Sequence, residues 1–150
     1  EMPYANGIEV SADGQEFYIA SSGLLKVFAF SNSNPTRLLR SSETLSFIPD
    51  NLHMSDGGRL ITGGLEITDP DCGDVPMSLE FDLEKFASCP RPFTILAVDP
   101  QSMQDSVIAS SPAHKHFSNI TMALEVGTEL WIGTFAGDRI AYRNLEQRND

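Results

Sequence analysis

The sequence repeats itself after 44 residues, and this repeat constrains the fold more than any other feature. When Leu52 is aligned with Ile8, the segment 48–64 (IPDNLHMSDGGRLITGG) is similar to the segment 4–21 (YANGIEVSADGQEFYIAS). A third, weaker copy spans residues 120–134 (ITMALEVGTELWIGT). Each copy holds an alternating apolar segment, a turn and an apolar run, which predicts two antiparallel strands. A repeat of about 40–45 residues made of short strands is typical of the blades of a β-propeller.

The repeats predict an all-β chain that forms a partial propeller over residues 1–150. We expect about three four-stranded blades, over residues 4–47, 48–111 and 118–145. The second unit is too long for one blade, and the excess lies in an insertion at residues 65–92. Three blades cannot close a ring, because known propellers have about 4–8 blades. An open array exposes sheet faces and strand edges, so we expect a missing N-terminal half, a second copy in a homodimer or another chain to complete it.

One short helix is predicted inside the insertion. Leu79, Leu83 and Phe86 of the segment PMSLEFDLEKFAS have the i, i+4, i+7 spacing of one helix face. Pro76 suits the first turn of this helix, and Pro90 prevents its continuation. We expect the apolar stripe to pack on the rest of the chain; the alternative is a groove for a partner.

The composition argues against two classes of partner. The formal net charge is −11, whereas proteins that bind nucleic acid carry a basic surface that neutralises phosphates. No apolar run approaches the roughly 20 residues that a membrane-spanning helix needs. We therefore expect no nucleic acid and no membrane span. The excess of acids is compatible with a cation site or with a plain solvated surface.

The two cysteines, Cys72 and Cys89, lie in the loop-rich insertion. They would form a disulfide in an exported protein, and they are otherwise two free thiols. Neither a CxxC spacing nor a neighbouring histidine indicates zinc. Asn119-Ile120-Thr121 matches the glycosylation sequon, but it lies in an expected strand and carries little weight. The acidic composition and the cysteine pair favour an extracellular or other exported location without deciding it.

Polar side chains precede the innermost strand of two repeats. Asn6 and Asp50 occupy equivalent positions in the alignment, and Asn51 follows Asp50 directly. The innermost strand of a blade begins at the mouth of the central channel, so we expect these side chains to converge there. Amide and carboxylate oxygens suit calcium, and the absence of sulfur and imidazole at these positions disfavours zinc and copper. Alternatively, the Asn-Gly and Pro-Asp-Asn sequences are only turns.

The same segments resemble the C-terminal half of the paraoxonase/arylesterase family, whose relatives include the gluconolactonase- and regucalcin-type six-bladed propellers. YANGIEVSADGQEFYIASS resembles the NGI blade of that family, and PDNLHMSDGGRLITGG resembles its (V/P)DN blade. SNITMALEVGTELWIGTFAGDRIAYRNL resembles its last blade. The resemblance covers most of residues 4–64 and 118–145, and the insertion matches only in kind.

This resemblance implies a calcium-dependent hydrolase of lactones or aryl esters. Its catalytic calcium would be held by Asn6, Asp50 and Asn51 and would polarise the carbonyl of the substrate. Asp50 would also be catalytic by helping to activate water, although binding a metal lowers the basicity of a carboxylate. The remaining ligands of the family, a glutamate and an asparagine, and its proposed histidine shuttle belong to the first half and have no counterpart in this sequence.

Other interpretations stay open. The chain is alternatively a non-catalytic propeller piece in which any calcium is structural, because this architecture hosts unrelated chemistries. In a homodimer with its twofold axis along the channel, two copies of the three ligands would supply about six oxygen-bearing side chains. His53, His114 and His116 match no motif of the family. We expect packing or surface roles for them, although the loop of the last two borders the active-site face in relatives.

Overall fold

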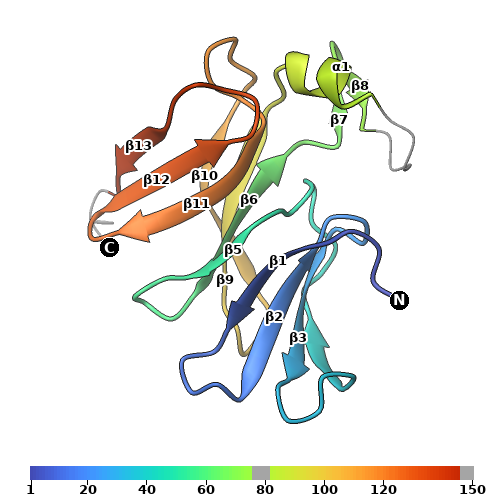
Figure 1. Ribbon diagram of the computed structural model, residues 1–150. Helices are drawn as coiled ribbons and strands as arrows, with labels where there is room; N and C mark the ends of the chain where they lie inside the picture. Colours follow the sequence, from blue (N-terminus) through green and yellow to red (C-terminus); the bar gives the residue numbers. More distant parts are fainter. Residues whose placement is uncertain (76–81, 146–150) are drawn as a thin grey trace.

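The computed structural model describes residues 1–75 and 82–145, and strands dominate within them (Figure 1). The first sheet has four antiparallel strands that follow one another in chain order. Its strands are β1 (Ala5–Val10), β2 (Glu16–Ser21), β3 (Lys26–Ser31) and β4 (Leu38–Ser41). Buried and half-buried positions alternate along β3, which is the pattern of a sheet covered on one face.

Two further antiparallel sheets follow, in the orders β5-β6-β9-β10 and β11-β12-β13. Their strands are β5 (Leu52–Met54), β6 (Leu60–Leu65), β9 (Phe93–Val98), β10 (Asp105–Ser111), β11 (Ile120–Val126), β12 (Glu129–Thr134) and β13 (Ala141–Asn144). The insertion between β6 and β9 carries β7 (Thr68–Asp69), β8 (Gly73–Asp74) and α1 (Leu83–Ser88). The predicted all-β fold of blade-like sheets, with one short helix in an insertion, is confirmed.

The second sheet repeats the first with a shorter turn. Val10 pairs with Phe17 across the β1–β2 turn, and Met54 pairs with Leu60 across the β5–β6 turn. The offset between the two sheets is therefore 44 residues in the first strand and 43 residues in the second. β5 lies beside both β1 and β11, so these three strands form the inner side of the array.

Two apolar layers hold the three sheets together. The layer between the first and second sheets includes Tyr18, Phe47, Leu52, Leu60 and Leu96. The layer between the second and third sheets includes Ile61, Ile95, Ile120, Leu130 and Ile132. Because the second sheet is covered on both faces, every residue of β6 and β9 is buried. Each buried side chain of this size contributes about 1.5–3 kcal/mol, so face-to-face packing is what positions the sheets.

Each end of this row of sheets presents an open face. Phe17 and Ile19 of the first sheet are half-buried on the face away from the second sheet. Their counterparts in the repeat, Leu130 and Ile132, are buried against the second sheet. Equivalent positions therefore face the same way in each sheet, and they are buried only where a neighbouring sheet is present. The exposed apolar residues of the open faces are Ile8, Val10 and Leu38 on the first sheet, and Val126, Trp131, Ile140 and Tyr142 on the third.

A disulfide and a buried arginine fasten the insertion. Cys72 is bonded to Cys89, with Cα atoms 5.8 Å apart, so the disulfide alternative holds for this pair. The Arg91 guanidinium is buried, donates to the Cys72 carbonyl at 3.1 Å and lies 5.7 Å from the ring of Phe86. Phe86 in turn stacks on Phe135 beyond β12. Phe86, the last residue of the predicted apolar stripe, therefore packs on the rest of the chain.

The helix begins later than its sequence pattern suggests. Asp82 caps α1 by accepting a hydrogen bond from the Lys85 N–H at 3.0 Å. Pro76 and Leu79, which belonged to the predicted helix, lie outside the described residues. No helix in the described part of the chain is long and apolar enough to cross a membrane.

Asn119, the asparagine of the sequon, links the insertion to the third sheet. Its side chain is fully buried. Its Nδ2 donates to the carbonyls of Ala87 and Cys89 at 3.2 and 3.0 Å, and its Oδ1 accepts from the Arg91 N–H at 3.0 Å. All the polar atoms of this amide are therefore used inside the fold, and the residue has a structural role.

Candidate metal site at the start of the inner strands

The Asn6-Gly7 pair lies inside β1 and does not form a hairpin turn. Ala5 pairs with Ser21 and Ile8 pairs with Ile19, so β1 carries an extra residue between them and forms a bulge. The backbone of the second sheet passes directly against this bulge, because the Gly7 N–H donates to the carbonyl of Asp50 at 2.9 Å. The bulge therefore brings Asn6 to the segment that carries the other two predicted ligands.

Backbone hydrogen bonds hold Asp50 between two sheets. Its carbonyl accepts from Gly7 of the first sheet, and its own N–H donates to the carbonyl of Gly63 in β6 at 3.2 Å. The residue is thus fixed from both sides just before β5 begins. The position of its carboxylate follows from the packing of the first and second sheets, and not from a local turn.

Asn51 connects the second sheet to the third. Its backbone N–H and its side-chain Nδ2 both donate to the carbonyl of Thr121, at 3.0 and 3.1 Å. A carbonyl can only accept, so the amide nitrogen must face Thr121 and the Oδ1 atom must face away. The same Nδ2 lies 3.3 Å from Oδ1 of Asp50. No donor in the described residues reaches the Oδ1 of Asn51, so that oxygen is available to a ligand.

The orientation of Asn6 is determined in a similar way. The Ser22 hydroxyl donates its single proton to the carbonyl of Pro49 at 2.7 Å. It can therefore only accept from Asn6, whose Nδ2 lies 3.3 Å from it. The Oδ1 of Asn6 is left without a donor among the residues that the structure describes. Ser22 and Thr121 are positioning residues that sequence reasoning missed, because their partners are distant in the chain.

Asp50 is the carboxylate of this site, and it is poorly solvated. Burial raises the pKa of its carboxyl from 3.8 to about 6. Within residues 1–75 and 82–145, no lysine or arginine forms an ion pair with it. A cation beside the carboxylate would favour its charged form and lower this pKa again. The described part of the chain thus supplies a carboxylate at this position without a cationic side chain to pair with it.

The three side chains offer the type of ligand atom that calcium prefers, but fewer ligands than calcium needs. Asn6, Asp50 and Asn51 offer amide and carboxylate oxygens, the ligands that calcium prefers. No group of three or more His, Cys, Asp and Glu residues within the described ranges could hold a metal, which disfavours zinc. Calcium takes about 6–8 oxygens, so these three side chains make up part of a coordination shell.

None of the three histidines forms a hydrogen bond with Asp50 within the described residues. His53 belongs to β5 and pairs with Ile61 across the sheet. His114 and His116 lie in the loop before β11, with their rings 5.5 Å apart, and the His116 N–H donates to Nδ1 of His114 at 3.2 Å. The site as described therefore contains no imidazole that could act as its base.

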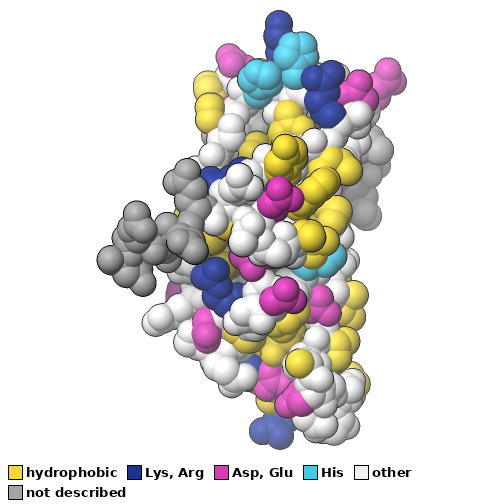
Figure 2. Space-filling model, turned by 90° about the vertical axis from the view of Figure 1, so that its left-hand side faces the viewer, with side chains coloured by type: hydrophobic (Ala, Val, Ile, Leu, Met, Phe, Trp, Pro, Cys, Tyr) yellow, Lys and Arg dark blue, Asp and Glu magenta, His cyan; other side chains and the backbone are white. Residues whose placement is uncertain are grey.

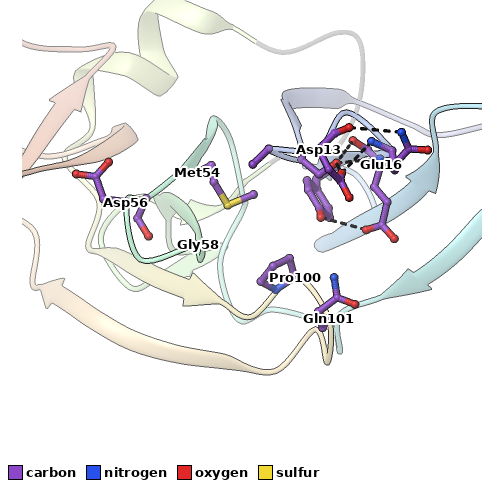
Figure 3. Close-up of a pocket in the computed structure, with 12 residues that line it drawn as sticks. Asp13, Glu16, Met54, Asp56, Gly58, Pro100 and Gln101 are labelled. Carbon is purple, nitrogen blue, oxygen red and sulfur yellow. Dashed lines mark hydrogen bonds between the residues drawn. The ribbon is translucent and has the colours of Figure 1, made fainter.

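A second group of acids lies at the opposite end of the strands, around a cavity of about 430 Å³ (Figure 3). Most of its polar side chains already have protein partners. Glu16 is paired with Arg40 through both carboxylate oxygens, which lowers the pKa of Glu16. Burial and the hydrogen bond to Glu16 raise the pKa of Tyr18 to about 12. Asp13 accepts from Ser11 at 2.7 Å. These contacts make a structural network, so this cavity is not a second metal site.

Comparisons with known proteins identify the fold. No model of a known protein family matches the sequence, and no curated protein sequence matches it. The WD40 repeats of RRP9 match with a TM-score of 0.54 at 14% identity, over 88% of this chain and 33% of that one. An oligogalacturonate lyase in complex with manganese matches with a TM-score of 0.61 at 12% identity, over 95% and 38%. A protein assigned as a 6-phosphogluconolactonase from Bacteroides fragilis matches with a TM-score of 0.52 at 14% identity, over 93% and 34%.

These likenesses show the fold alone, because the identities are low and one propeller fold serves many functions. The chain has the fold of a propeller fragment. It spans about a third of the length of the solved structures that it matches.

Proposed function

We propose that this chain is the C-terminal half of a calcium-dependent hydrolase of lactones or aryl esters, similar to the paraoxonase/arylesterase family. The observation that supports the proposal most is the environment of Asp50. Asp50 is half-buried, and its carboxylate lacks a cationic partner in the described part of the chain. Asn51 follows it directly, and Asn6 is brought to it by the backbone hydrogen bond from Gly7 to Asp50. The amide nitrogens of Asn6 and Asn51 donate to Ser22 and Thr121, and that of Asn51 also donates to Oδ1 of Asp50. Neither amide oxygen accepts a hydrogen bond in the described residues.

The proposed roles follow from these contacts. Calcium bound here would supply the positive charge that stabilises the oxyanion formed from an ester or lactone carbonyl. Ser22 and Thr121 fix the orientations of the Asn6 and Asn51 amides, which leaves each amide oxygen without a donor in the described residues. Asp50 is both ligand and candidate catalytic residue, orienting water or accepting its proton. We place the ligand role first, because metal binding lowers the basicity of a carboxylate.

The proposal requires further blades to complete the site. Three oxygen-bearing side chains are fewer than the 6–8 oxygens that calcium takes, and both end sheets have open apolar faces. Blades of an N-terminal half would cover these faces and add ligands. Alternatively, a second copy would cover them in a homodimer and bring a second set of the same three side chains.

A non-catalytic role is the second candidate. It is favoured by one observation: no histidine in the described residues contacts Asp50, so the site lacks an obvious proton shuttle. In that case calcium would only fasten the start of β1 to the start of β5. Turnover separates the two candidates, because a structural ion stabilises the fold without hydrolysing anything.

Thermal unfolding with excess chelator and then with millimolar calcium tests the ion first. A ligand that binds only the folded state at a hundredfold excess over its Kd adds about 2.7 kcal/mol. We expect calcium to raise the Tm, and the same sample to hydrolyse phenyl acetate or a γ-lactone. Asp50→Asn should lose both effects, whereas Asp56→Asn, at the opposite end of the strands, should keep them. Equal behaviour of the two variants would refute the site, and calcium binding without turnover would favour the structural role.

A further inference from the structure

A polar cavity of about 330 Å³ lies at the end of the third sheet where β11 begins. It is lined by the loops 115–118 and 136–139, which precede β11 and follow β12. The same end of β11 touches the candidate metal site, because the Thr121 carbonyl accepts both hydrogen bonds from Asn51. The cavity and the contact with Asn51 therefore lie at the same end of β11.

Two cationic side chains and a histidine gather at this cavity in a chain that is otherwise strongly acidic. Lys115, His116 and Arg139 line it, and the ring of His114 lies 5.5 Å from that of His116. Figure 2 shows basic and histidine side chains together at the top of the molecule, with acidic side chains on either side of them and over the surface below. With a net charge of −11, most of this protein repels anions. The positive charges of Lys115 and Arg139 make the electrostatic potential at this cavity less negative than over the rest of the surface.

The cations at the cavity keep hydrogen-bonding capacity. Arg139 donates from Nε to Oδ1 of Asp138 at 2.9 Å, and its two terminal nitrogens have no partner in the described ranges. The ammonium of Lys115 likewise has no acceptor there. Asp138 is 85% exposed, and an exposed ion pair of this kind contributes little. A bound anion can therefore engage the free side of the guanidinium without breaking a buried contact.

Aromatic contacts fix both loops that carry these charges. Phe117 packs edge-on against Phe93 of the core, with ring centroids 6.1 Å apart. Phe135, at the start of the other loop, stacks on Phe86 at 5.7 Å. The Ala136 N–H donates to the Thr134 hydroxyl at 3.1 Å. The cationic side chains thus project from anchored backbone, which lowers the entropy lost on binding.

We propose that this cavity binds the anionic group of the ligand, a carboxylate or a phosphate, with Lys115 and Arg139 as its main contacts. The choice of substrate class rests on the proposed function. If the chain is part of a lactone or ester hydrolase, its substrates would carry a negative charge away from the reacting carbonyl. Lys115 acts as a point charge, and Arg139 supplies the fork that suits a planar or tetrahedral oxyanion. Both residues bind substrate, and neither takes part in bond cleavage.

The first test is binding of inorganic phosphate to the full chain without calcium, at constant ionic strength, followed by calorimetry or NMR. We expect saturable binding, weakened at least tenfold in the double variant Lys115→Gln/Arg139→Gln, which is the effect of losing charge-assisted hydrogen bonds. Arg37→Gln, an exposed arginine at the far end of the first sheet, should bind like the parent. No saturable binding, or equal binding by the double variant, would overturn the proposal.

The second test compares two esters in the presence of calcium, a phenyl hemisuccinate and the neutral phenyl butyrate. The double variant should lose about tenfold in kcat/KM for the charged ester and keep its activity on the neutral one. Equal losses on both esters would overturn the substrate assignment. If the parent hydrolyses neither ester but binds phosphate as expected, the proposed hydrolase fails while the anion site stands.

Discussion

The backbone N–H of Gly7 donates to the carbonyl of Asp50 at 2.9 Å, and a β-carbon on residue 7 would lie 2.4 Å from that same oxygen. It would also lie 2.5 Å from the backbone nitrogen of Leu52. The first and second sheets therefore meet at a position where only glycine fits. The absence of a side chain at residue 7 allows the two backbones to come close enough for this hydrogen bond. The same close approach places the neighbouring residue Asn6 next to the segment that carries Asp50.

Gly7→Ala should destabilise the fold by about 2–3 kcal/mol, because the backbone of the second sheet has to move away. It should also weaken calcium binding, since Asn6 moves with it. Chemical denaturation with and without calcium measures both effects. Gly57→Ala is the matched control, because the nearest atom to its β-carbon is 3.8 Å away, and it should change stability by less than about 0.5 kcal/mol.

The contribution of Asp50 to the stability of the calcium-free chain should fall as pH rises from about 4 to above 6. The folded state holds the Asp50 proton more tightly than the unfolded chain, whose carboxyl titrates near 3.8, and the folded pKa is about 6. This contribution is fully present below the unfolded value and is lost as pH rises through the folded value. The full difference corresponds to about 3 kcal/mol, and we expect about 1–2 kcal/mol because some solvent contact remains.

Urea denaturation across this pH range checks the prediction, with Asp50→Asn as the test variant. The amide does not titrate, so this pH dependence should disappear and the variant should match or exceed the parent in stability at pH 7 without calcium. Calcium should reverse that order by stabilising the parent alone. An unchanged pH profile in Asp50→Asn would show that another group is responsible.

Ser22→Ala should destabilise the fold by about 1–2 kcal/mol and lower calcium affinity. The variant leaves the buried carbonyl of Pro49 without its donor and removes the acceptor that orients Asn6. Thermal melts in chelator report the first effect, and calcium titration reports the second. Ser46→Ala changes an exposed serine and should alter neither the stability nor the calcium affinity.

Removal of the disulfide in Cys72→Ser/Cys89→Ser should lower stability by about 3 kcal/mol, because a loop with a sequence separation of 17 residues is no longer closed in the unfolded chain. Unfolding in denaturant, with and without a reductant, measures it. The reductant should bring the parent to the level of the variant and leave the variant unchanged. A variant as stable as the oxidised parent would contradict the prediction.

If a second copy covers the open faces, the chain should have twice its monomer mass at micromolar concentration. Trp131→Glu, at the centre of the exposed face of the third sheet, should then shift it to the monomer. Light scattering gives the mass, and the fluorescence of the single tryptophan reports its burial. Val107→Glu is the control, because Val107 is 57% exposed on β10 and lies away from both open faces. A strict monomer would exclude the homodimer and leave the N-terminal half to cover these faces.

The sequence predicts what is local in this fold. Alternating apolar residues and turn glycines define the strands, and the repeat places Asn6 and Asp50 at equivalent points. The sequence pattern does not predict that the offset between the repeats is 44 residues in the first strand and 43 residues in the second. This difference arises because the turn between β5 and β6 is one residue shorter than the turn between β1 and β2. Strand patterns constrain pairing only after the turn is known.

The supporting contacts of the candidate site were not predictable from the sequence. Ser22 reaches Pro49 across 27 residues, and Asn51 reaches Thr121 across 70 residues. Such contacts depend on how whole sheets pack, and a serine or threonine outside any motif gives no sign of them. The choice between a disulfide and free thiols was open for the same reason, since only the folded insertion brings the two cysteines together.

The buried sequon has a consequence for how this protein can be produced. Oligosaccharide is transferred to nascent, unfolded chains, and at that stage Asn119 is accessible. A glycan attached then would occupy the Nδ2 atom that later donates to Ala87 and Cys89, and the fully buried site has no room for it. Expression in a host that glycosylates secreted proteins should therefore give a modified, misfolded fraction. A bacterial periplasm, which forms disulfides without this modification, should give uniform material.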